Sequence, residues 1–296
     1  MKVLIVTGGD SSERIVSLIS AKNVQKALEE NGHDVTQYDL RKGYEPIVKL
    51  AQSFETLFPV LHGEEGEGGQ LHDFLSRIDK PIVGTRNYKG LKNGWYKIPF
   101  KKFATKSGLP TSPWIEIKTK EDIIKFGFPS VLKASHGGSS HEVVILKSEK
   151  DLNTKNAKGL LSSNFKLYVE KYIDGVEITV GILDGKALPV LEIKPPEGEW
   201  FSYENKYTPG TKEIPNAPSV PLNKQKEAQE IALKIHDNFN FGTYSRTDFI
   251  YSQNIPYALE INTIPGLTSE SLIPKAARAA GINFNQFVEI LLNKAQ

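Results

Sequence analysis

A short apolar strand that passes through a glycine loop into an amphipathic helix restricts the fold more than any other feature of the sequence. Residues 3–6 are wholly apolar and run into a Thr-Gly-Gly turn, as in a buried strand that ends at a loop. Apolar side chains then recur at helical spacing over residues 14–30, and Gly32 ends the pattern. This unit predicts an open, parallel α/β sheet at the N-terminus.

The rest of the patterning divides the chain into three predicted domains. The N-terminal unit gains a helix at residues 69–78 and three strands at residues 35–39, 54–61 and 81–84. Beyond it, helix and strand are mixed rather than strictly alternating. We expect an N-terminal α/β domain over residues 1–88, a central domain over 89–174 and a C-terminal domain over 175–296.

The central and C-terminal domains are expected to be of mixed α+β type. The central pattern is a lysine-rich helical stretch over 91–107 that leads into residues 109–117, followed by a short helix and by strands at 130–133, 142–146 and 166–173. The C-terminal pattern comprises a hairpin turn at Asp184 and Gly185, a long polar loop over 195–221, a helix over 224–239, strands at 243–251 and 257–262, and two closing helices. Loops of that length are usually functional or disordered.

Composition favours a cytoplasmic enzyme that acts on small molecules. The net charge is only +2, so no dominant field points to nucleic acid or to an anionic membrane. The N-terminal apolar run is too short for a signal peptide, and no apolar stretch of about 18 residues predicts a membrane span. The chain has no cysteine, so any metal site depends on oxygen or histidine ligands.

Two neighbouring strands in the segment SRTDFIYSQNIPYALEIN carry polar side chains at every second position, which places them on one face. The short connection at residues 252–256 suggests an antiparallel hairpin. Its polar face would gather Arg246, Asp248, Glu260 and Asn262. Its other face would turn Phe249, Leu259 and Ile261 to the core. Two carboxylates and an amide oxygen suit Mg²⁺, with Asp248, Glu260 and Asn262 as ligands, whereas the alternative is the solvated face of an edge hairpin.

The segment that follows this hairpin adds hydrogen-bond donors. Residues 263–272 contain a Pro265-Gly266 turn, and hydroxyl side chains then lead into the N-terminus of a predicted helix. Backbone N–H groups in such a turn can stabilise an oxyanion or hold a carboxylate. The segment therefore favours a reactive site over a solvated hairpin.

The C-terminal segment LEINTIPGLTSESLIPKAARAAG resembles the signature of D-alanine–D-alanine ligases, and two N-terminal segments support the resemblance. GGDSSERIVSL is similar to the first motif of that family, and VLHGEEGEGGQL is similar to the second. Alone, both would be read as solvated glycine loops. The resemblance implies that Glu13 and His62 lie at the subsite of the first D-alanine, with Glu67 in support.

The resemblance extends to the nucleotide elements. It implies that Lys97, Lys133 and the loop over residues 136–140 hold the triphosphate, since a lysine charge and a glycine loop suit phosphate. Taken singly, a lysine or a glycine loop is more often an ordinary surface feature. The implied adenine and ribose contacts are Glu170, Lys171, Tyr172, Ile173 and Glu177. Without the resemblance, this strand would be a plain amphipathic edge.

The long polar loop resembles the mobile lid of the family in its segment YENKY. The resemblance implies that Tyr207, Ser139 and Glu13 form a hydrogen-bonded triad that orients the substrate amino group. It also implies that Lys206 contacts phosphate. From its own residues, the loop would be only a polar excursion.

The family likeness implies a three-domain ATP-grasp fold, whose last two domains sandwich ATP. Two Mg²⁺ ions, or Mn²⁺, would assist attack of one D-alanine carboxylate on the γ-phosphate to give an acyl phosphate. A second D-alanine, held near Ser271 and Leu272, would then attack, with Arg246 and the Gly266 N–H stabilising the oxyanion. The product, D-alanyl-D-alanine, would serve peptidoglycan synthesis. Members of the family are commonly homodimers, so the resemblance also points to one.

Two departures from the family pattern keep other functions open. His141-Glu142-Val143 stands where a Val-Gly-Met-like segment is usual, and Trp95-Tyr96 replaces Met-Asp before Lys97. A carboxylate near a triphosphate is repulsive unless it faces away or meets a cation. The alternatives are a ligase for another amino acid or D-lactate, a catalytically silent ATP-binding module, and an ATP-grasp enzyme of another branch.

Overall fold

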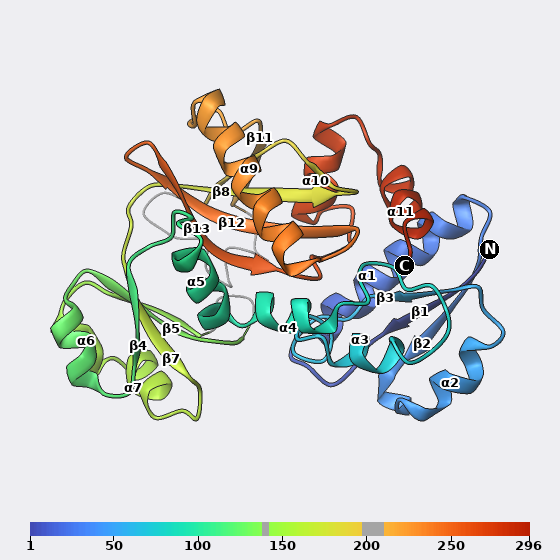
Figure 1. The fold of residues 1–296 in the computed structure, drawn as a ribbon, viewed down its shortest axis with the longest axis horizontal. Coiled ribbons are helices and arrows are strands. Elements are labelled where there is room, and N and C mark those ends of the chain that lie inside the picture. Colours follow the sequence, from blue (N-terminus) through green and yellow to red (C-terminus); the bar gives the residue numbers. More distant parts are fainter. Residues whose placement is uncertain (138–141, 197–209) are drawn as a thin grey trace.

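Three β-sheets organise the computed structural model, which describes residues 1–137, 142–196 and 210–296. The N-terminal sheet and the four-stranded sheet lie toward opposite ends of the molecule, and the third sheet lies between and above them in the view of Figure 1. Both chain termini lie at the end that holds the N-terminal sheet. Within the described ranges, no helix is both long and apolar enough to cross a membrane.

The N-terminal sheet confirms the predicted parallel arrangement. Its order is β2-β1-β3, with strands β1 (Lys2–Thr7), β2 (Asp34–Asp39) and β3 (Thr56–Pro59). The helical elements are α1 (Arg14–Glu30), η1 (Leu40–Lys42), α2 (Glu45–Ala51) and α3 (Gln70–Leu75). Apolar side chains of β1 alternate between two cores, so that Val3 and Ile5 face α1 while Leu4 and Val6 face the other side.

The predicted strand at residues 81–84 is wrong, because only an isolated parallel bridge joins Ile82 to Leu57. Pro81 has no N–H to donate, which shortens any ladder there. The two backbone groups of Ile82 instead bond to the C-terminal residue Gln296, at 2.8 and 2.9 Å. The C-terminus is thus held against the edge of the N-terminal sheet.

The predicted helix over residues 91–107 is two helices, α4 (Tyr88–Trp95) and α5 (Lys97–Lys106). Tyr96 between them is extended, with ψ of 116°. The cause is Pro99, whose ring would clash with the carbonyl four residues earlier in a continuous helix. The break places Lys97 at the start of α5.

The four-stranded sheet has the order β4-β7-β5-β6, and its strand pairs are all antiparallel. The strands are β4 (Trp114–Ile117), β5 (Ser130–Ala134), β6 (Val143–Leu146) and β7 (Leu167–Lys171). The helical elements are α6 (Lys120–Phe126), η2 (Glu149–Asn153) and α7 (Lys155–Leu161), which share one apolar core with the sheet. Strand β4 begins only at Trp114, since Pro110 and Pro113 precede it.

The third sheet runs β11-β10-β8-β12-β13, with β9 paired to β8. Its strands are β8 (Val176–Leu183), β9 (Lys186–Ala187), β10 (Leu191–Lys194), β11 (Lys212–Pro215), β12 (Tyr244–Ser252) and β13 (Ile255–Asn262). The predicted turn at Asp184 and Gly185 is confirmed, with both residues at positive φ. The predicted loop over 195–221 is interrupted by β11, whose pairing with β10 no local pattern indicated.

Three helices in the described part of the C-terminal region connect the sheets. They are α9 (Leu222–Phe239), α10 (Leu272–Ala279) and α11 (Phe284–Asn293). Helix α9 shares a core with β8, β12 and α5, whereas α10 and α11 share one with β1 and α1. This last core fastens the N-terminal sheet to the end of the third sheet where the polar hairpin face lies.

Candidate active site

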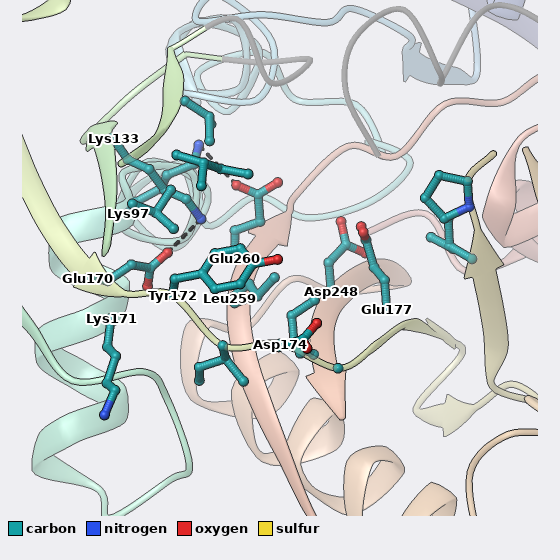
Figure 2. A pocket seen from close by; sticks show the side chains of 18 of the residues that line it. Lys97, Lys133, Glu170, Lys171, Tyr172, Asp174, Glu177, Asp248, Leu259 and Glu260 are labelled. Atoms are coloured by element: carbon teal, nitrogen blue, oxygen red, sulfur yellow. Dashed lines mark ion pairs between the residues drawn. The ribbon is translucent and has the colours of Figure 1, made fainter. Parts of the chain in front are cut away.

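A cavity of about 500 Å³ lies between the four-stranded sheet and the third sheet. Val131 and Ile145 line one side of it and Ile193, Ile250 and Leu259 the other. Charged groups occupy the remaining wall, and Figure 2 shows Lys133 and Glu170 on one side of Glu260 with Asp248 and Glu177 on the other. An apolar slot beside fixed charges suits a ligand with a flat ring and an anionic tail.

Strands β12 and β13 form the predicted antiparallel hairpin. Asp248 lies opposite Glu260, and Arg246 lies opposite Asn262, so the four polar residues share one face. Phe249 and Ile261 are buried in the core as predicted. Leu259, however, lines the cavity rather than the core. A β-bulge at Asp248 and Phe249 leaves Leu259 without an opposite residue and turns it to the other face.

The predicted ligand oxygens can hold a divalent cation. Both oxygens of Asp248 accept from Arg246, at 2.8 Å each, and Thr179 donates to one of them at 2.5 Å. The Asn262 Oδ1 atom is buried and has no hydrogen-bond partner among residues 1–137, 142–196 and 210–296, which fits a cation ligand. Among the described residues, no three His, Asp or Glu side chains gather as ligands, so the amide oxygen is needed to complete the set.

Lys97 joins the hairpin to the glycine loop. Its ammonium donates to the Gly137 carbonyl at 3.1 Å and lies 3.3 Å from Glu260 Oε2. Its backbone N–H donates to the Ser135 carbonyl at 2.6 Å, which fixes the start of α5 against the end of β5. The break before α5 is therefore what aims Lys97 at the predicted cation ligands.

Glu170 lines the cavity and belongs to a buried ion cluster. Lys133 contacts its Oε1 atom at 2.6 Å, and Lys101 and Ser112 contact its Oε2 atom. Burial alone would raise the pKa of Glu170, but Lys101 and Lys133 outweigh it and hold the pKa at about 2. The carboxylate is thus ionised and matched on both oxygens.

The segment after β7 forms the rim of the cavity. Tyr172, Ile173 and Glu177 line it, but Tyr172 N–H already donates to the Pro129 carbonyl at 3.2 Å. That N–H can read a ligand only by giving up this bond. Lys171 also reaches the rim, although its side chain points away from Lys133 and Glu170 in Figure 2.

Three predicted residues meet at the N-terminal side of the hairpin. Glu13 precedes the first turn of α1, and it is near enough to the buried His62 and Glu67 to influence their ionisation. Burial lowers the pKa of His62 against the opposing effect of Glu13. Burial, with help from Glu13, raises the pKa of Glu67 to about 8. The Gly63 N–H donates to Glu67 at 3.0 Å and keeps its side chain in place.

The segment after β13 returns to this same place. Leu267 N–H donates to Ser20 of α1 at 3.3 Å, and the carbonyl oxygen of Glu67 accepts from Thr263 at 3.0 Å. Gly266 faces the Ser271 hydroxyl, which a β-carbon would approach to 2.8 Å. Leu272 is buried in the core, so only its backbone can serve a ligand.

The two departures from the family pattern touch the same part of the site. Glu142 lines the cavity beside Gly137, where a β-carbon would lie 2.2 Å from the Glu142 carboxylate. Gly137 has φ of 122°, so the glycine is needed there. Tyr96 donates from its hydroxyl to Glu64 at 3.0 Å and joins α5 to the N-terminal loop.

Some predicted site residues lie outside the described ranges, and some residues that contact the site have no clear signal in the sequence. Ser139, Lys206 and Tyr207 lie outside the described residues. The sequence patterns miss Lys101, Ser112 and Thr179, although Lys101 and Ser112 contact Glu170 and Thr179 contacts Asp248. Lys101 follows Lys97 by one helical turn, and that spacing was the available signal. For Ser112 and Thr179 the sequence held none.

The two antiparallel sheets with a cavity between them, joined to an open parallel sheet, define the ATP-grasp class. A family profile described as D-ala D-ala ligase C-terminus matches residues 99–293. D-alanine–D-alanine ligases of Maridesulfovibrio salexigens and Aquifex aeolicus are both 36% identical, covering 100% and 99% of this chain and 99% and 100% of their own lengths. The chain belongs to the D-alanine–D-alanine ligase family.

Solved structures agree with this placement. The D-alanine–D-alanine ligase of Bacillus anthracis superposes with a TM-score of 0.86 at 29% identity, covering 99% of this chain and 97% of that one. A second structure of that enzyme, complexed with ATP, gives 0.84 at 28% identity over 99% and 96% of the two chains. The likeness therefore extends across all three sheets.

Proposed function

We propose that this protein joins two D-alanine molecules into D-alanyl-D-alanine, with ATP converted to ADP and phosphate. The observation that carries the proposal is the position of the polar hairpin face. It lies between the cavity on one side and the Glu13, His62 and Glu67 group on the other. A site that transfers phosphate from a nucleotide to a small acid needs both sides to meet at one cation.

The cavity is proposed to take ATP. Its apolar walls suit the adenine ring, the rim from Glu170 to Ile173 suits the amino edge of the ring, and Glu177 suits the ribose hydroxyls. Lys97 and Lys133 supply positive charge for the phosphates. Lys206, outside the described residues, is proposed to add a further contact. The solved relative with ATP supports this choice of nucleotide.

Asp248, Glu260 and Asn262 are proposed to hold Mg²⁺, or Mn²⁺, which when bound would neutralise the phosphates. The buried Asn262 Oδ1 atom, which has no partner in the described part of the chain, supports this assignment. Lys97 would shift from Glu260 toward phosphate once the nucleotide is present, since its ammonium lies within reach of both the ligand face and the glycine loop.

Glu13 and His62 are proposed to hold the first D-alanine so that its carboxylate oxygen attacks the γ-phosphorus and ADP leaves. The free amine of the second D-alanine then attacks the acyl carbonyl, and phosphate leaves. Arg246 and the Gly266 N–H are proposed to stabilise the oxyanion, while Ser271 and the Leu272 backbone hold the second carboxylate. Ser139 and Tyr207, outside the described residues, are proposed to complete a triad with Glu13.

An assay of the purified protein with ATP, Mg²⁺ and one amino acid at a time tests the proposal. Phosphate release is expected with D-alanine and not with L-alanine, and mass spectrometry should detect the dipeptide. No phosphate release with D-alanine would sink the proposal. The same assay with D-alanine plus D-lactate measures the alternative acceptor, which the unusual Glu142 beside the cavity motivates.

The cellular role follows from this activity. D-alanyl-D-alanine is proposed to enter peptidoglycan synthesis in the cytoplasm, where ATP is available. A homodimer is proposed from the family likeness, and light scattering after size-exclusion chromatography would measure the mass in solution.

A further inference from the structure

Lys101 is a fully buried lysine immediately behind the cavity. Its side chain is 0% exposed and comes from the middle of α5, and it is not among the residues that line the cavity. Its ammonium contacts Thr111 Oγ1 at 2.7 Å, Ser112 Oγ at 3.0 Å and the Glu170 carboxylate. Because Lys101 does not line the cavity, an electrostatic effect on a bound nucleotide would act through its charged partner Glu170.

The hydrogen bonds show that Lys101 is charged. Thr111 donates its own hydroxyl proton to the Ala258 carbonyl at 2.8 Å, and Ser112 donates its proton to Glu170. Each hydroxyl can therefore only accept from Lys101, and the carboxylate can only accept as well. Three acceptors need three N–H groups, which an ammonium has and a neutral amine lacks. Burial lowers the pKa of Lys101, but this arrangement opposes the loss of its proton.

Two ammonium groups, those of Lys101 and Lys133, share direct contact with the single carboxylate of Glu170. Glu260 pairs with Lys97, and Glu260 and Glu177 act on Lys133 without a direct ion pair to it. Of the two lysines in the cluster, only Lys133 reaches the cavity. Without Lys101, Lys133 would be the one lysine of the described residues in direct contact with Glu170, and the carboxylate would neutralise it.

We propose that Lys101 is a positioning residue that neutralises Glu170 from behind and so leaves the charge of Lys133 available to the phosphates of the nucleotide. This inference rests on the proposed function, in which the cavity takes ATP. It makes Lys101 a determinant of phosphate affinity without any contact to the ligand. A merely structural role, as a link between α5 and β7, would instead weaken binding of every nucleotide alike.

Calorimetric titration of adenosine, ADP and ATP with Mg²⁺ separates the two roles. Lys101→Met removes the charge, and Lys101→Gln removes it but keeps N–H donors for Glu170 and Ser112. Both should weaken ATP binding about tenfold, ADP less, and adenosine about twofold or less, because the lost interaction acts on phosphate charge. Lys102→Met is the matched control, since that neighbouring side chain is 62% exposed and pairs with the exposed Glu116.

A rescue variant sharpens the test. Lys101→Met combined with Glu170→Gln removes both charges and leaves Lys133 unmatched, so the ratio of ATP to adenosine affinity should return to that of the unchanged protein. Equal weakening of adenosine and ATP in both single variants, or a ratio that the double variant does not restore, would overturn the inference alone. Failure of the unchanged protein to bind ATP would overturn the proposed function first.

Discussion

Two buried carboxylates on opposite sides of the hairpin differ sharply in ionisation. Glu170, beside the cavity, is 2% exposed, and its pKa is about 2. Glu67, on the N-terminal side, is 6% exposed, and its pKa is about 8. Burial pushes both values upward, so burial does not explain the difference. Two lysine ammonium groups in direct contact explain it for Glu170, whereas Glu67 has Glu13 nearby and only more distant cations.

The comparison teaches what each side of the site is built to do. The cavity side pairs its lysines with carboxylates in direct contact, and two of them, Lys101 and Lys133, share the single carboxylate of Glu170. The N-terminal side holds a carboxyl group that is largely protonated at neutral pH and can donate a hydrogen bond. The polar hairpin face joins these two environments.

The largest expected effect comes from the residue at the junction. Glu260→Ala removes a proposed ligand of the cation at which the nucleotide and the first D-alanine would meet. Turnover should therefore fall at least about 10³-fold. Phosphate release with D-alanine and ATP measures it, with circular dichroism to show that the fold is kept. Glu230→Ala on the exposed side of α9 is the control and should leave turnover unchanged. Near-normal turnover of the Glu260 variant would refute the cation assignment.

The next effect breaks the charge matching on the cavity side. Glu170→Ala leaves Lys101 and Lys133 buried without their carboxylate, and the free energy of unfolding should fall by about 3–5 kcal/mol. Urea unfolding measures it. Glu116→Ala breaks an exposed lysine pair of the same sheet and should cost no more than about 1 kcal/mol. Equal losses of unfolding free energy in the two variants would contradict the stronger role given to the buried cluster.

On the N-terminal side, pH should reveal the raised pKa of Glu67. Because its folded pKa is about 8 and its ordinary value is 4.5, the folded protein binds more protons than the unfolded chain between them. Glu67 therefore contributes stability below pH 4.5 that is lost as the pH rises toward 8. At pH 5 the free energy of unfolding of Glu67→Gln should be close to that of the unchanged protein. Toward pH 8 the variant should become relatively more stable, by at most about 1.4 kcal/mol per pH unit. A constant difference in unfolding free energy across this range would show that Glu67 is ionised throughout.

The smallest effect concerns the contact between the two sides. Tyr96→Phe removes only the hydrogen bond from the hydroxyl to Glu64, so the free energy of unfolding should fall by about 0.5–1.5 kcal/mol. Thermal unfolding measures it. Tyr88→Phe, on the same helical stretch, is the comparison variant. A larger loss than that of Glu170→Ala would mean that the two sides depend on this single contact.

Local patterns were enough for several parts of the fold and site. The apolar run before Thr7 predicted β1, and the alternation around Asp248 and Glu260 predicted which side chains share a face. These succeed because a strand has a period of two and a helix of 3.6 whatever it packs against. The same patterns missed β11 and misplaced Leu259, because pairing with a distant strand and a bulge are not written in neighbouring residues.

The sequence by itself determined the kinds of residue at the site and their order along the chain, including the carboxylates, the lysines and the glycine turns. Only the tertiary structure decided which of them meet. Lys101 of α5, Ser112 of the connection before β4 and Lys133 of β5 all contact Glu170. The pKa of Glu170 cannot be read from any one segment, because it depends on burial and on cations that the whole fold brings near.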